Sequence, residues 1–133
     1  MRVLTALMLF AMLSGCVTTP EVKPLMQQLK GEVHFPAALP RPATVEVAVL
    51  SMIEGRPLQM VAIRYEVTML PLMFDLRLTP LQLAEGEIYV RTRLWFIDDI
   101  AVQAVSQQKV FKVFNSDNMV ISLQPKLCYP LCQ

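Results

Sequence analysis

The chain has 133 residues, of which 54% are hydrophobic and 17% are charged, and its formal net charge is +1. This length suits a single domain, and the near-neutral charge without a basic cluster excludes an extended nucleic-acid-binding surface. The four scattered glycines form no phosphate-binding loop, and neither GxSxG nor HExxH occurs. We therefore expect a non-enzymatic protein with no cofactor, no metal site and no nucleic-acid partner.

The first 15 residues have the layout of a secretory signal peptide. Arg2 is followed by an apolar run from Val3 to Leu13 and then by small residues. Its 11 residues fall short of the roughly 20 that a membrane-spanning helix needs. Removal of Arg2 leaves 11 basic residues against 11 acidic ones, so membrane attachment has to come from a lipid rather than from charge.

The stretch Leu13-Ser14-Gly15-Cys16 resembles the lipobox of bacterial lipoproteins. The resemblance implies cleavage before Cys16, a diacylglycerol thioether on its sulfur, and a further acyl chain on the new amino group. Two or three acyl chains hold a protein durably on a membrane. Val17 follows where an aspartate commonly signals inner-membrane retention, which favours delivery by the lipoprotein sorting machinery to the periplasmic face of the outer membrane. The alternative is an ordinary signal peptide with an incidental cysteine.

The chain then divides into segments of different composition. We predict a cleaved signal peptide over 1–15, a lipidated tether over 16–30 and a β domain over 31–133. Within the tether, Pro24 at a first helical position favours one or two helical turns over 24–30.

From Gly31 onward the apolar residues alternate with polar ones, which is the period of two of strands with one buried face. Pro71 and Pro80 bracket one strand, which indicates an edge or short strand, and the segment 103–114 is ambiguous and fits a helical turn. We expect an all-β, mainly antiparallel sandwich of seven or eight strands, or a cracked small barrel, with at most one short helix. The expected inward-facing residues are Val33, Phe35, Val45, Val47, Val49, Val61, Ile63, Tyr65, Val67, Phe74, Leu76, Leu78, Ile88, Val90, Leu94 and Phe96.

Cys128 and Cys132 enclose only three residues near the end of the chain. In an oxidising compartment we expect them to form a disulfide that shapes the C-terminal tail. A metal or redox pair is the alternative. It fits less well because the spacing is CxxxC rather than CxxC and because the one histidine, His34, is far away in sequence.

Two polar features have a plain structural interpretation beside a functional one. His34 lies on the polar face of a strand and is interpreted as a solvated side chain, since a catalytic base needs a nucleophile and an orienting partner. Asp98-Asp99 is interpreted as a turn, because no histidine or further carboxylate cluster supports a metal or acid pair.

Two apolar stretches lie where polar residues are expected. The sequence 94–97 is apolar on both faces, which is explained either by packing of the tether or the C-terminal tail or by a groove for a partner segment. The apolar residues beside Pro71 (Leu70, Leu72 and Met73) can likewise be explained either by packing within the protein or by a groove for a partner segment. The predicted partner contacts are Leu70, Leu72, Met73 and Trp95.

Three stretches of the chain resemble the YbaY/YscW lipoprotein family: GEVHFPAALPRPATVEVAVLSM, PLMFDLRL and GEIYVRTRLWF. The matching positions are Gly31, Val33, Ala38-Leu39-Pro40, Ala43, Val45, Val47, Val49, Pro71, Phe74, Leu76, Tyr89 and Arg91. Family members with a known role are pilotins of type III secretion systems. The resemblance implies a small outer-membrane lipoprotein that binds the C-terminal tail of the secretin subunit and promotes its outer-membrane targeting and assembly.

The sequence leaves the function and the binding mode open. The first hypothesis is a secretin carrier, which would bind a helix in a groove or add a strand to an exposed edge. The second is a general envelope lipoprotein of structural or stress-related role without a secretin client, and a third is an inhibitor-like module for another periplasmic protein.

Overall fold

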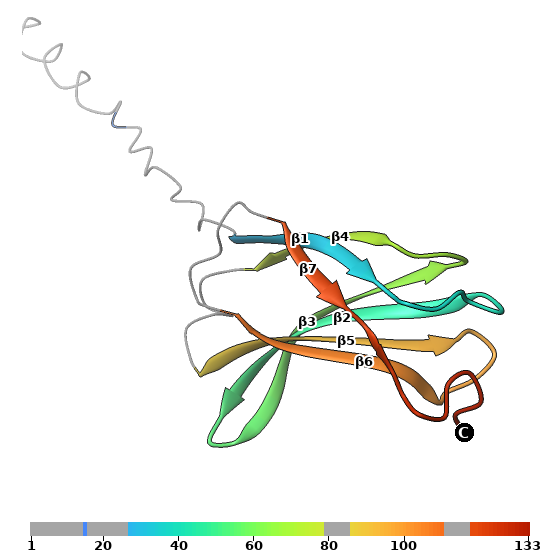
Figure 1. Ribbon diagram of the computed structural model, residues 1–133. Helices are drawn as coiled ribbons and strands as arrows, with labels where there is room; N and C mark the ends of the chain where they lie inside the picture. Colours follow the sequence, from blue (N-terminus) through green and yellow to red (C-terminus); the bar gives the residue numbers. More distant parts are fainter. Residues whose placement is uncertain (1–14, 16–26, 79–85, 111–117) are drawn as a thin grey trace, which may run out of the picture.

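The computed structural model describes residue 15 and residues 27–78, 86–110 and 118–133, and this part of the chain contains eight strands and no helix (Figure 1). It therefore has no helix with the length and apolarity to cross a membrane. The strands are β1 (Gln27–His34), β2 (Ala43–Ile53), β3 (Arg56–Val67), β4 (Leu72–Leu78), β5 (Glu87–Phe96), β6 (Val102–Val110), β7 (Met119–Ser122) and β8 (Gln124–Pro125).

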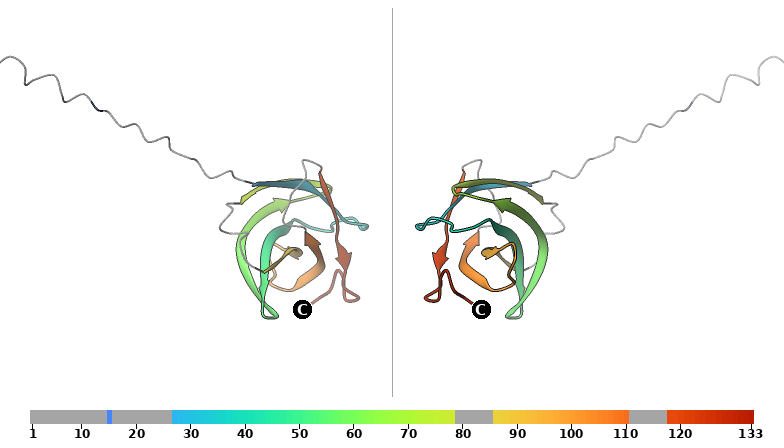
Figure 2. Two further views of the ribbon diagram at one scale, coloured as in Figure 1. Left: turned by 90° about the vertical axis from the view of Figure 1, so that its left-hand side faces the viewer. Right: turned by 90° about the vertical axis from the view of Figure 1, so that its right-hand side faces the viewer.

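The strands form two sheets that face each other. A three-stranded sheet has the order β4-β1-β7, and a five-stranded sheet has the order β3-β2-β5-β6-β8. Every neighbouring pair is antiparallel except β1 and β7, which run parallel. Figure 2 shows the larger sheet curling beneath the smaller one. The prediction of a mainly antiparallel all-β sandwich of seven or eight strands is confirmed.

The alternation of apolar and polar residues places the predicted inward residues between the two sheets. Strand β4 has Phe74, Leu76 and Leu78 buried against the core and exposes the residues between them. It lies at the edge of its sheet, as its flanking prolines indicated. Strand β2 lies inside the larger sheet and is largely buried on both faces.

The first strand begins earlier than the sequence indicated. Residues 27–30 belong to β1 and pair with the end of β4, and Leu29 is buried in the core. The strand therefore begins four residues before the predicted start of the β domain at residue 31, and the helical turn predicted over 24–30 is wrong for its described part, 27–30, because Leu29 continues the inward alternation of the strand. Residues 16–26 lie outside the described part of the chain.

The ambiguous segment 103–114 is also a strand where it is described. Residues 102–110 form β6 and pair with β5 along most of its length. The helical turn considered there is wrong for 103–110, since strand pairing satisfies the backbone groups. Residues 111–114 lie outside the described residues.

Asp98-Asp99 forms the turn between β5 and β6, as predicted. The backbone amide of Asp99 donates to the Phe96 carbonyl at 3.0 Å. The Asp99 carboxylate accepts hydrogen bonds from the amides of Ile100 (2.7 Å) and Ala101 (3.1 Å). These bonds fix the turn and project Ile100 into solvent, where it is 95% exposed.

Candidate functional site

The predicted lipidation site, Cys16, precedes β1 by a short stretch of chain. Cys16 and residues 17–26 lie outside the described residues, so lipidation stays a prediction. Figure 1 shows that β1 begins at the end of the sandwich opposite the C-terminus.

Cys128 and Cys132 form a disulfide with a Cα–Cα distance of 4.8 Å, in agreement with the sequence interpretation. The loop they close is held against the sandwich by Tyr129, whose hydroxyl donates to the Ala38 carbonyl at 2.9 Å. Gln103 exchanges two hydrogen bonds with the backbone of Cys132, of 3.2 and 3.3 Å. The C-terminal tail thus closes one end of the core rather than covering the outer face of the larger sheet.

The structure separates the four predicted partner contacts. Leu70 and Leu72 are half-buried and pack against the core. Met73 points outward from the three-stranded sheet and is 65% exposed. It lines a recess of about 270 Å³ with Lys30, Gly31, Tyr65, Phe74, Asp75 and Asn118.

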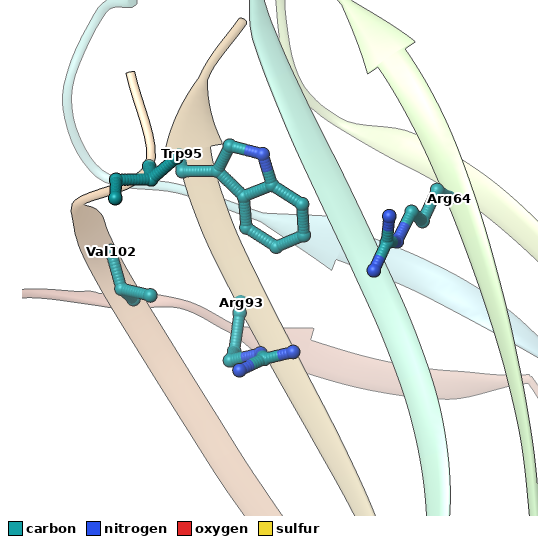
Figure 3. A pocket seen from close by; sticks show the side chains of 5 residues that line it. Arg64, Arg93, Trp95 and Val102 are labelled. Carbon is teal, nitrogen blue, oxygen red and sulfur yellow. The ribbon is translucent and has the colours of Figure 1, made fainter.

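Trp95 points outward from the five-stranded sheet, on the opposite side of the sandwich from Met73. It lines a recess of about 300 Å³ together with Arg64, Arg93, Ile100 and Val102 (Figure 3). The guanidinium carbons of Arg64 and Arg93 lie 5.5 and 5.7 Å from the centroid of the Trp95 ring, within cation–π range. This cluster, called the Trp95 recess below, combines an apolar floor with cationic walls.

A buried carboxylate organises those cationic walls. Glu46 lies in the middle of β2 and is 1% exposed. The strand pairing of the sheet places Glu46 between Arg64 of β3 and Arg93 of β5. Arg64 Nε donates to Oε2 at 2.9 Å, and Arg93 donates through Nε (3.2 Å) and Nη2 to Oε1. The sheet register thus converts three distant residues into one hydrogen-bonded group.

The charge of Glu46 is stabilised by these contacts. Burial alone would raise the pKa of Glu46, but hydrogen bonds from Arg93 and Arg64 and the attraction of both guanidinium groups hold it below its ordinary value. The carboxylate is therefore ionised at neutral pH and neutralises one positive charge.

A third arginine adds positive charge beside this pair. Arg91 Nη2 lies 3.9 Å from Glu46 Oε1, and its Nε is buried without a hydrogen-bond partner among the described residues. Burial lowers the pKa of Arg91, repulsion from Arg93 lowers it further, and Glu46 opposes the shift. Because a guanidinium stays protonated at all physiological pH, three positive charges share one carboxylate here.

The sequence interpretation identified Trp95 and missed Glu46 and the arginines. A usable signal was present: one acidic residue lies inside the valine-rich strand ATVEVAVL, and Arg91 and Arg93 lie two apart on a neighbouring outward face. An acidic residue on a strand with Ala48 and Leu50 on the same face indicates a buried charge that needs a partner.

Comparison with known proteins identifies the family of this chain. Residues 24–123 match the family described as "Type III secretion system lipoprotein chaperone (YscW)". The chain belongs to the YscW family. It is 38% identical over 128 residues to a type 3 secretion system pilotin of Yersinia enterocolitica, and this alignment covers 96% of this chain and 92% of that relative. It is 31% identical over 124 residues to a type 3 secretion system pilotin of Pseudomonas aeruginosa, covering 91% and 86%.

The fold of this YscW-family chain is also similar to that of a solved structure. An alternative pilotin from the type II secretion system of Vibrio cholerae matches with a TM-score of 0.57 and covers 77% of this chain and 100% of its own. At 16% identity, this likeness supports the fold alone. The family resemblance expected from the three sequence stretches is confirmed by the family match and by both pilotin relatives.

Proposed function

We propose that this chain is a type III secretion pilotin. It binds the C-terminal region of a secretin subunit and promotes the targeting of that subunit to the outer membrane and its assembly there. The observation that carries the proposal is the 38% identity to a type 3 secretion system pilotin across 96% of the chain. The family description as a chaperone fits a non-enzymatic role.

Attachment to the membrane determines where the bound secretin subunit is delivered. Acyl chains on Cys16 hold the domain on the periplasmic face of the outer membrane, after delivery by the lipoprotein sorting machinery. Residues 16–26 can reach at most about 40 Å, so the domain stays close to the bilayer. A secretin subunit bound to it is concentrated at that surface, and its unpaired strand edges are kept from premature association.

The test compares secretin multimers in outer-membrane fractions from the parent strain, a strain lacking this protein, and a strain carrying Cys16→Ser. Loss of the protein should reduce outer-membrane multimers. Cys16→Ser should leave the protein able to bind the subunit while moving both out of the outer membrane. Normal multimer levels without the protein would contradict the pilotin role, and normal levels with Cys16→Ser would contradict only the lipid anchor.

The partner contacts at Met73 and Trp95 stay predictions that single substitutions can separate. Met73→Ser changes an exposed side chain and should leave the fold intact, so weaker secretin capture by this variant would assign a contact to the three-stranded sheet. Leu70 and Leu72 are poor probes, because they pack against the core and their loss would destabilise the domain.

A further inference from the structure

The Trp95 recess has accessible binding groups of two kinds side by side. Among the described residues, Arg64 donates to Glu46 through its Nε, and its side chain is 67% exposed, so its Nη donors are accessible to solvent. Beside it, Trp95, Ile100 and Val102 form an apolar floor. Ile100 is held in solvent by a turn that Asp99 closes, so its exposure is built into the fold.

The charge of the recess defines what it attracts. Arg64, Arg91 and Arg93 surround the single carboxylate of Glu46, which leaves two positive charges uncompensated within the cluster. Glu46 also fixes the guanidinium of Arg93 in place, because it accepts two hydrogen bonds from that side chain. A guanidinium plane matches a carboxylate through paired N–H donors.

The surroundings limit the size and type of the anion. Glu66 lies on the same outward face of β3 as Arg64, and Asp98 and Asp99 lie in the turn next to Ile100. These carboxylates would repel a long polyanion such as a nucleic acid. The recess therefore favours a single carboxylate that lies next to an aliphatic side chain.

We propose that the Trp95 recess binds an acidic, aliphatic segment of the secretin subunit. One carboxylate of that segment contacts Arg64 and Arg93, and a neighbouring aliphatic side chain packs on Trp95, Ile100 and Val102. This proposal rests on the proposed function and names the surface and the chemistry of its partner. The recess lies near the end of β5, away from the start of β1 (Figure 1).

The chain has one tryptophan, and it lies in the recess. Binding can therefore be followed by Trp95 fluorescence. The probe is a tryptophan-free synthetic peptide of the secretin C-terminal region, titrated into the full-length protein in detergent, with calorimetry as a second readout. A matched peptide carries Asn and Gln in place of each Asp and Glu.

The expected result is a change in Trp95 fluorescence with the acidic peptide that weakens with added salt. Affinity should fall about tenfold with Arg64→Gln, with Ile100→Ser and with the neutral peptide. Arg77→Gln and Leu58→Ser are matched controls, because both side chains are exposed elsewhere, and they should bind like wild type. Far-UV circular dichroism checks that each variant is folded.

Three outcomes would overturn the inference. Equal affinity for wild type, Arg64→Gln and Ile100→Ser would place the partner elsewhere and leave the pilotin role standing. A peptide that does not bind the wild-type protein would refute both this surface and C-terminal recognition. A fluorescence response to glycerol 3-phosphate that needs Arg64, with none to the peptide, would identify a lipid headgroup as the ligand.

Discussion

Replacement of Glu46 by glutamine tests whether the buried carboxylate holds the outer face of the larger sheet together. The change removes one negative charge and keeps the shape of the side chain. The charge-assisted bond to Arg93 is worth about 2 kcal/mol, and the bond to the 67% exposed Arg64 is worth about 0.5–1 kcal/mol. We expect Glu46→Gln to lower the free energy of unfolding by about 3 kcal/mol at neutral pH. This value is at the low end of the losses that follow removal of one partner of a buried ion pair, because both arginine side chains can turn toward water.

The same reasoning predicts how the effect depends on pH. The folded-state pKa of Glu46 lies below the ordinary value of 4.5, so the folded state binds this proton less readily than the unfolded state. Its stabilising contribution is complete above the unfolded-state pKa and is lost as the pH falls through the folded-state pKa. The stability difference between wild type and Glu46→Gln should therefore shrink below about pH 4.5.

Urea denaturation between neutral and acidic pH measures both effects. Glu66→Gln is the matched control, because it makes the same chemical change at an exposed position on the same face, and it should shift stability by less than about 0.5 kcal/mol. Equal stability of wild type and Glu46→Gln at neutral pH, or a difference that persists in acid, would refute the role assigned to the carboxylate.

Three further variants test the packing of the sandwich by thermal or urea unfolding. A Cβ at Gly31 would run into the backbone oxygen of Met119, so Gly31→Ala should destabilise the domain by about 1–3 kcal/mol; an unchanged midpoint would contradict the close approach of β1 and β7. Thr92 is buried, and its hydroxyl has no hydrogen-bond partner among the described residues. Thr92→Val should therefore stabilise the domain by about 1 kcal/mol. A loss of stability would show that the hydroxyl has a hydrogen-bond partner in the folded protein. Serine at both Cys128 and Cys132 should cost only about 2 kcal/mol, because the closed loop is short; a much larger loss would show that the disulfide does more than constrain the unfolded chain.

Much of the fold could be predicted from local sequence patterns. A period of two reports which side chains share a face of a strand, and it identified the buried faces of β2, β4 and β5 correctly. Prolines marked the edge position of β4. The ends of strands were predicted less well than their buried faces. Leu29 belongs to β1, although the sequence around it is typical of a proline-rich tether. Its burial depends on pairing with Leu76, which lies far along the chain.

The candidate site depends on which strands are neighbours in the sheet, and local sequence patterns do not predict strand order. The sequence by itself determined that Trp95 lies on the strand face where a polar residue is expected and that the residues beside Met73 are apolar, and it favoured a disulfide between Cys128 and Cys132, which the structure contains. Only the tertiary structure placed Met73 and Trp95 on opposite sides of the sandwich and turned Leu70 and Leu72 toward the core. Strand order and register also brought arginines from 18 and 47 residues away onto Glu46, because sheet pairing is set by the collective burial of both sheets rather than by any single segment.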